Sequence, residues 1–324
     1  MQGLGVTLVA MIVAAGQAPP SKADPTPQDV RAAIERSLPF LEREGVAWKE
    51  TKGCTSCHHV PMMIWSHHEA GKHGFTINKV AVEEAETWAL GQYLKHPEFM
   101  PTGQDRSFPR RGPGPGSVYL ALGVGAAGHE GDPAAEALSK LSDHFAGMQE
   151  GDGSWAIKQS TPPLVDGDDV ATMLILLAMD KKGTDAVGKA RRKALEWLEH
   201  APRRDETQPL ALRAMVAARY GDGGEAQGSA TRLRGRQAED GGWSQVAGRS
   251  SDALATGQVL CALVAAGEAH DSPTIGRAWR FLLASQRDDG SWLVKTRTPK
   301  GHDEIVTYYG TGWATIGLMR SLTR

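Results

Sequence analysis

Three segments of the sequence share one pattern: FAGMQEGDGSW (145–155), LRGRQAEDGGW (233–243) and FLLASQRDDGSW (281–292). Each contains a glutamine, then an acidic turn with glycine, and then Ser or Gly followed by Trp. After each comes a loop and an apolar segment with an Ala-Thr pair, at 171–172, 255–256 and 314–315. Self-similarity of this kind indicates a repeat architecture, in which each unit buries its apolar face against the next one.

The same alternation of helices extends through residues 28–324. We expect six pairs, each with an amphipathic outer helix and a small, apolar inner helix. The pairs are 28–43 with 59–72, 79–95 with 116–128, 133–148 with 168–180, 185–199 with 207–220, 224–237 with 251–267, and 273–286 with 308–322. Because a curved stack of six hairpins can close into a ring, the sequence predicts an all-α, α6/α6 toroid around a central cavity.

This pattern resembles that of the terpenoid cyclase and protein prenyltransferase superfamily, whose α/α toroids carry QW motifs. The three segments ending in Gly-Ser-Trp or Gly-Gly-Trp match that motif. In the family the motif stiffens the turns between helices and is not catalytic. Squalene–hopene cyclases have two such barrels, and this chain has the length for one.

The segment VDGDD (165–169) is similar to the Asp-x-Asp-Asp motif of squalene–hopene-type cyclases. The resemblance implies that Asp168, the middle aspartate, is the acid that protonates an alkene. Two features depart from the family pattern. Val170 stands where threonine usually follows the motif. Counting back from the Ala-Thr pairs aligns Asp168 with Asp252, and helix capping alone would explain an acidic residue at both positions. With 6 % aromatic residues overall, we also expect only a thin aromatic lining for carbocations.

Prenyltransferase activity is disfavoured by the positions of its expected zinc ligands. In that branch of the superfamily an Asp, a Cys and a His on the late inner helices hold zinc. Asp252 and Cys261 are too far apart along one helix to share a metal with any obvious histidine.

Cys54, Cys57 and His58 form a Cys-x-x-Cys-His sequence, which is the attachment motif of c-type haem. Two thiols three positions apart reach the two porphyrin vinyl groups as thioethers, and the adjacent histidine supplies the proximal iron ligand. A thioredoxin-like dithiol would need a βαβ context, and a zinc site would need four well-placed ligands. We therefore expect one covalent haem c with His58 as an axial ligand.

The ring topology limits the candidates for the sixth iron ligand. Trp48 takes the place of a QW tryptophan, so the haem motif falls in the loop between an outer and an inner helix. The corresponding loops of the neighbouring hairpins contain His302, Met100 and His96, which are alternative candidates. An open position or a water molecule is an equal alternative.

The leading hypothesis from the sequence is an exported monohaem c-type protein on a cyclase-like toroid. It would transfer electrons to an unknown redox partner, or carry out haem-dependent redox chemistry on an apolar or isoprenoid-like molecule in the cavity. One alternative is a class II terpenoid cyclase-like enzyme that uses Asp168 as general acid. The other is a non-catalytic module that binds an apolar ligand.

Composition and the N-terminus bear on partners and location. With 36 Lys+Arg against 38 Asp+Glu, the chain is nearly neutral and gives no indication of a nucleic acid or anionic membrane partner. The apolar run at 4–15 is too short to span a bilayer comfortably. We expect a signal peptide at 1–18, cleaved near Ala18, then a linker at 19–27 and a periplasmic or cell-envelope location; a retained anchor is the alternative.

Overall fold

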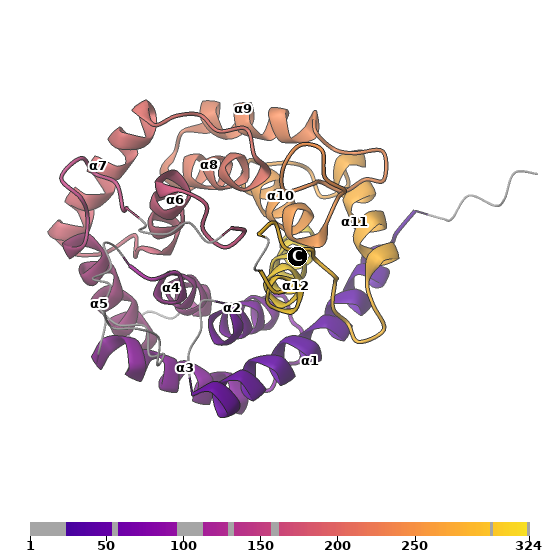
Figure 1. The fold of residues 1–324 in the computed structure, drawn as a ribbon, viewed down its shortest axis with the longest axis horizontal. Coiled ribbons are helices and arrows are strands. Elements are labelled where there is room, and N and C mark those ends of the chain that lie inside the picture. The colour runs from indigo at the N-terminus through magenta and orange to yellow at the C-terminus, as the bar shows by residue number, and fades with distance from the viewer. Residues whose placement is uncertain are drawn as a thin grey trace, which may run out of the picture.

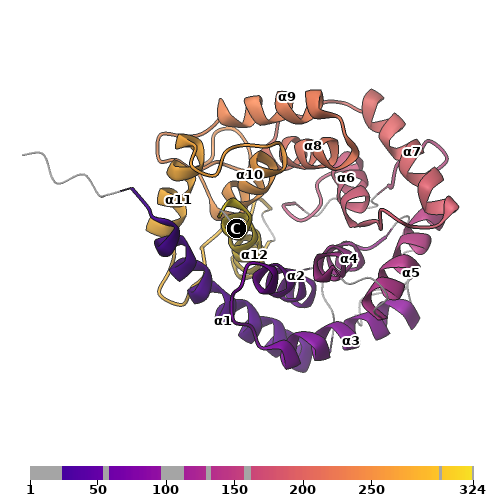
Figure 2. The ribbon, with the colours of Figure 1, turned by 180° about the vertical axis from the view of Figure 1, so that it is seen from behind.

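The helices form two concentric rings around a central axis (Figures 1 and 2). The computed structural model describes residues 24–53, 58–95, 113–128, 133–156, 162–298 and 301–322, and twelve helices lie in these ranges. The outer ring contains α1 (Pro27–Lys52), α3 (Lys79–Lys95), α5 (Pro133–Gly147), α7 (Asp185–His200), α9 (Gly223–Arg234) and α11 (Pro273–Ser285). The inner ring contains α2 (His59–Lys72), α4 (Pro115–Ala127), α6 (Asp168–Ala178), α8 (Thr207–Tyr220), α10 (Ala253–Ala265) and α12 (Asp303–Ser321). The predicted α/α toroid is confirmed.

Capping side chains begin the outer helices at defined residues. The hydroxyl of Thr26 accepts a hydrogen bond from the backbone N–H of Asp29 at 3.2 Å. The Asp29 carboxylate in turn accepts from the backbone N–H of Thr26 at 2.9 Å. This reciprocal pair satisfies two N–H groups that the helix itself leaves unbonded. Ser272 caps α11 ahead of Pro273 with a single bond, in which its hydroxyl accepts from the backbone N–H of Ile275.

The glutamine of each QW segment connects one outer helix to the next. The Nε2 of Gln149 donates to the carbonyl of Gly153 in its own turn at 2.9 Å, and to the carbonyl of Ala190 in α7 at 2.7 Å. The other two segments repeat both bonds: Gln237 with Gly241 and Thr274, and Gln286 with Gly290 and Ala33. The bond from Gln286 to Ala33 joins the last hairpin to the first and therefore closes the ring.

The tryptophan of each segment connects the outer ring to the inner ring. The indole N–H of Trp155 donates to the Phe145 carbonyl of α5 at 2.8 Å, and its backbone N–H donates to the Thr172 hydroxyl of α6 at 3.1 Å. The other two tryptophans do the same: Trp243 with Leu233 and Thr256, and Trp292 with Leu282 and Thr311. The threonines of two of the three predicted Ala-Thr pairs thus accept the hydrogen bond from the tryptophan backbone. In the last hairpin the acceptor is Thr311, one turn before Thr315.

Glycine in these turns is required by the approach of the next outer helix. Gly153 has a φ of 99°, a region that favours glycine. A Cβ at this position would lie 2.5 Å from the carbonyl oxygen of Lys193 in α7. Gly290 is also left-handed, and its Cβ would collide with the carbonyl oxygen of Arg36 in α1.

Small residues let the inner helices pack closely, as their composition predicts. A Cβ on Gly123 of α4 would lie 3.1 Å from the backbone nitrogen of Trp65 in α2. A Cβ on Gly257 of α10 would collide with the carbonyl of Trp313 in α12. At these crossings the backbones of the two helices are in direct contact. Large side chains elsewhere on the same helices therefore lie in the interior of the ring.

Three helices depart from their predicted bounds by three or more residues at one end. Helix α1 continues to Lys52 rather than ending near residue 43, and it stops where Gly53 adopts a φ of 58°. Trp48 therefore lies inside a helix and not in a QW turn. Helix α9 ends at Arg234 rather than at residue 237, and helix α12 begins at Asp303 rather than at residue 308.

Two sequence-based expectations concern membranes and export. Within the described ranges, no helix combines the length and the apolar character that crossing a bilayer requires. Residues 1–23 lie outside the described residues, so the signal peptide, its cleavage near Ala18 and most of the linker stay predictions.

The ring-closing glutamine offers a test of this account. Gln286→Ala removes the donor to Ala33 and leaves that carbonyl without its side-chain partner, which should lower the free energy of unfolding by about 1–3 kcal/mol. Thermal unfolding should show a melting temperature roughly 2–6 °C lower. Gln28→Ala, at an exposed position in the first turn of α1, is the control. Equal melting temperatures for the two variants would contradict a closing role for Gln286.

Candidate active site

The chain crosses the centre of the toroid at the end where the inner helices begin. Because each hairpin reverses the chain, the loops from outer to inner helices share this end of the ring. The segment that leads into α6 reaches across the central space toward α12 (Figure 1). Leu164 and Val165 in this segment are buried, so it contributes to the core of the ring as well as covering its mouth.

Side chains from three inner helices hold this segment in place. The Tyr119 hydroxyl of α4 donates to the Leu164 carbonyl at 3.1 Å. The Gln208 amide of α8 donates to the carbonyls of Pro163 at 2.9 Å and Leu164 at 3.2 Å. Tyr309 of α12 reaches the same Leu164 carbonyl at 3.5 Å and contacts the Tyr119 hydroxyl.

Aromatic rings from α2, α4 and α12 gather directly behind this segment. The rings of Trp65 and Trp313 meet edge to face with centroids 4.9 Å apart, and Tyr119 and Tyr309 do so at 5.5 Å. All four side chains are buried. These four residues fall within the predicted inner segments 59–72, 116–128 and 308–322, so an aromatic cluster forms here although aromatic residues are few in the chain as a whole.

The acidic motif lies at the same mouth, where arginines hold two of its aspartates. The Arg204 guanidinium is 3.2 Å from a carboxylate oxygen of Asp166 and 3.2 Å from one of Asp169. Arg297 contacts Asp166 from another loop, also at 3.2 Å. Asp168, the predicted acid, is the first residue of α6 and is exposed. The motif thus presents one exposed carboxyl between two carboxylates that form ion pairs.

Asp168 and Asp252 do not share a role, although the sequence aligns them. Asp252 caps α10: its carboxylate accepts from the backbone N–H of Ala255 and from the Gln245 amide, each at 2.9 Å. In α6 the capping position belongs to Gly167, and Asp168 follows it. Burial raises the pKa of the Asp252 carboxyl and also that of Asp169, where Arg204 opposes the effect.

The predicted haem motif is only partly described, because Cys54 and Cys57 lie outside the described residues. His58 is 8 % exposed and packs edge-on against Trp48, with ring centroids 5.3 Å apart. It also contacts the neighbouring His59 ring. His59 in turn is stacked between Trp48 at 4.1 Å and Tyr308 at 4.0 Å. Protein side chains therefore surround both imidazoles.

Of the three candidates for a sixth iron ligand, one lies in the described residues. His302 is exposed at the start of α12 and makes no side-chain cap there. His96 and Met100 lie outside the described residues.

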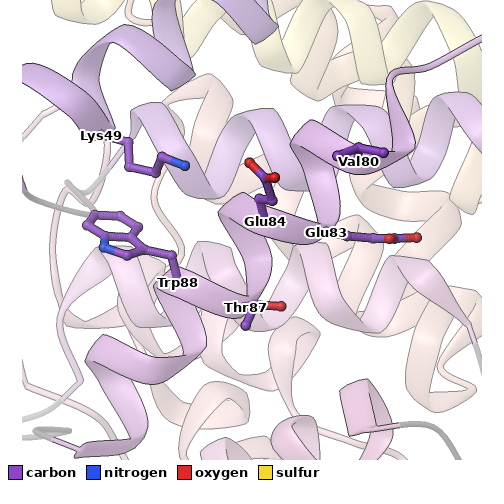
Figure 3. A pocket seen from close by; sticks show the side chains of 6 residues that line it. All are labelled: Lys49, Val80, Glu83, Glu84, Thr87 and Trp88. Atoms are coloured by element: carbon purple, nitrogen blue, oxygen red, sulfur yellow. The ribbon is translucent and has the colours of Figure 1, made fainter.

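A wider groove lies on the outer ring, between α1 and α3 (Figure 3). It encloses ≈ 510 Å³ and is lined by Lys49, Val80, Glu83, Glu84, Thr87 and Trp88. Lys49 lies beside Trp88, while the carboxylates of Glu83 and Glu84 project from α3 (Figure 3). This groove contains none of the predicted catalytic residues and lies away from the acidic motif.

The fold is similar to that of known terpene cyclases. The type II terpene cyclase MstE from Scytonema, in complex with geranylgeranyl dihydroxybenzoate as substrate, matches with a TM-score of 0.58 and 14% identity, over 91% of this chain and 98% of that one. A Tyr→Phe variant of MstE without ligand gives a TM-score of 0.60 and 13% identity, over 91% and 97%. A protein from Actinoplanes gives 0.57 and 17%, over 91% and 100%. No family model and no curated protein sequence matches this chain.

The prediction of a covalent haem c, with the electron transfer and haem-dependent chemistry built on it, is wrong. The similar structures include those of a type II terpene cyclase, one of them with the product merosterolic acid A. Within the described part of the chain, no group of three or more His, Cys, Asp or Glu side chains could hold a metal ion. The physical reason is visible at His58, because Trp48 and His59 pack against the imidazole that would have to face a porphyrin.

The buried histidines make the stability of the fold dependent on pH. Burial lowers the pKa of His58 to about 3, and burial together with the adjacent His58 lowers that of His59 to about 2. Both rings are neutral in the folded protein at pH 7, whereas in the unfolded chain they take up protons below about pH 6.5. The contribution of these two neutral imidazoles to the free energy of unfolding is therefore present above pH 6.5 and is lost as the pH falls toward 3.

We therefore expect His59→Phe, which keeps the ring stack, to reduce the loss of stability in acid. Between pH 7 and pH 5 the variant should lose about 2 kcal/mol less of its free energy of unfolding than the wild type does. Urea unfolding at the two pH values measures this difference. His200→Phe, at an exposed position on α7, should follow the wild type; the same pH dependence in all three proteins would refute the assignment.

Proposed function

We propose that this protein is a class II terpenoid cyclase-like enzyme that holds an isoprenoid chain inside the toroid. One juxtaposition carries the proposal: the segment with the acidic motif at its end touches the aromatic interior through Tyr119 and Tyr309. The toroid fold shared with MstE, whose structures contain geranylgeranyl dihydroxybenzoate, supports the same assignment.

Asp168 is the proton donor in this proposal. Asp166 and Asp169 are held by Arg204 and so remain acceptors in ion pairs. Asp168, at the exposed first position of α6, is the carboxyl to which the resemblance to the cyclase motif assigns the proton transfer. An acid for this step must be shielded from water, and Asp168 is exposed without a ligand. We infer that the bound chain covers it.

The reaction is an isomerisation. A proton moves from the Asp168 carboxyl to a terminal alkene carbon and leaves a tertiary carbocation on its neighbour. Internal alkenes attack this cation to form new carbon–carbon bonds, and loss of one proton from the final cation restores the balance. The faces of Trp65, Tyr119 and Trp313 supply the negative charge density that stabilises such cations.

Entry of a long chain requires movement of the segment across the mouth. The Leu164 and Val165 side chains occupy apolar space between the inner helices. The segment is held by hydrogen bonds to its carbonyls from Tyr119, Tyr309 and Gln208, whose net contribution is about 1 kcal/mol each. An apolar ligand that buries comparable surface can offset their loss.

A non-catalytic module that binds the same apolar ligand is the second candidate. The exposure of Asp168 favours it, because an acid that protonates an alkene must be shielded from water. In this case the ligand enters the toroid and leaves unchanged.

The acid assignment is tested with a linear C20 isoprenoid and product analysis by mass spectrometry. The wild type should yield cyclic isomers, and Asp168→Asn should reduce their formation at least about 100-fold while the ligand still binds. Asp185→Asn is the matched control, since Asp185 occupies the same first-turn position on an outer helix and should keep full activity. Binding without any conversion by the wild type would instead identify the non-catalytic module.

A further inference from the structure

A small polar pocket lies beside the acidic motif, between the segment across the mouth, α8 and α10. Its walls include Asp166, Gln208, Gln245, Gln258 and Arg297. Glu206, Leu254 and two prolines complete the lining. The pocket therefore has polar and apolar walls, and Asp166 of the acidic motif is part of them.

Four of these side chains carry buried polar atoms without a hydrogen-bond partner in the described part of the chain. They are the Oε1 atoms of Gln208 and Gln245, the Nε2 of Gln258 and the Nε of Arg297. The three glutamines are 7 %, 6 % and 2 % exposed, respectively. One such unpaired atom costs about 1–3 kcal/mol, so four around one pocket indicate a site for a polar group.

The hydrogen bonds that these glutamines already make determine which of their polar atoms are left without a partner. The Nε2 of Gln208 is used by the carbonyls of Pro163 and Leu164, and the Nε2 of Gln245 is used by Asp252. Their oxygens are therefore acceptors without a donor. The Nε of Arg297 is a donor without an acceptor, and the Nε2 of Gln258 lies near the Tyr309 hydroxyl without forming a well-placed hydrogen bond to it. A hydroxyl group donates once and accepts twice, and so it satisfies both kinds of partner.

The charges and the size of the pocket exclude larger or charged groups. Asp166 and Glu206 on its wall are already paired with Arg204 and Arg297, so the wall offers no uncompensated charge to a carboxylate, a phosphate or an ammonium group. The cavity has a volume of ≈ 10 Å³, at the lower end of the roughly 10–15 Å³ that one water molecule needs. The pocket accommodates one oxygen atom of hydroxyl type.

We propose that this pocket binds the hydroxyl oxygen of an isoprenoid alcohol. The proposal rests on the proposed function, and it specifies the substrate class as neutral isoprenols rather than hydrocarbons, acids or phosphate esters. Gln258 donates to the alcohol oxygen, and the alcohol hydrogen bonds to the Oε1 of Gln208 or Gln245. A water molecule is the other source of such an oxygen, and the alcohol hydroxyl replaces it when the chain binds.

The test compares two ligands, geranylgeraniol and the matching C20 hydrocarbon without the hydroxyl. Affinities are measured from the quenching of tryptophan fluorescence, with Trp65 and Trp313 as interior probes. The wild type should bind the alcohol at least about tenfold more tightly, because the hydrocarbon leaves the pocket's polar atoms unpaired. Gln258→Leu should reduce this preference to less than about twofold without weakening hydrocarbon binding. Gln258→Met serves the same purpose if the first variant does not fold.

Gln28→Leu, at an exposed position on α1, is the control and should keep the wild-type preference. Equal affinity of the wild type for both ligands means that water alone fills the pocket, which overturns this inference but leaves the proposed function standing. A preference that survives in the folded Gln258 variants also overturns it. Binding of neither ligand to the folded wild type overturns both the inference and the proposed function.

Discussion

The glutamine amides of the QW segments are the interactions on which the toroid depends. A helical hairpin buries only part of its apolar face, so each hairpin needs a neighbour at a fixed angle and distance. One amide that donates to its own turn and to the next outer helix supplies this geometry, and a left-handed glycine lets the two backbones approach. The bond from Gln286 to Ala33 is the special case, because it turns a stack of repeats into a closed ring.

Closure of the ring has a chemical consequence at the mouth. It brings α4, α8 and α12, which are distant in sequence, around one short segment that carries the acidic motif at its end. Arginines pair with two of the motif's carboxylates, and aromatic rings pack behind the segment. In the proposed function, the acid at the mouth, the aromatic faces within and the segment between them are the parts that protonation of an alkene chain requires.

Periodicity and the repeated glutamine–tryptophan pattern predicted the toroid and most helix bounds, since both reflect local structure. Long-range contacts were not predictable in this way. The burial of His58 between Trp48 and His59 depends on α1 running on to Lys52, and a local Cys-x-x-Cys-His pattern carries no information about that. Likewise the unpaired atoms around Gln258 arise only when α8, α10 and the segment before α6 meet.

The proposed function places an isoprenoid chain in the interior of the ring. A crystal structure of the Asp168→Asn variant with geranylgeraniol would show this, because the substitution prevents turnover of the ligand. We expect continuous density for the chain beside Tyr119 and Trp313, with Leu164 displaced from the mouth. Density confined to the outer groove near Lys49 and Trp88, with Leu164 still in place at saturating ligand, would contradict it.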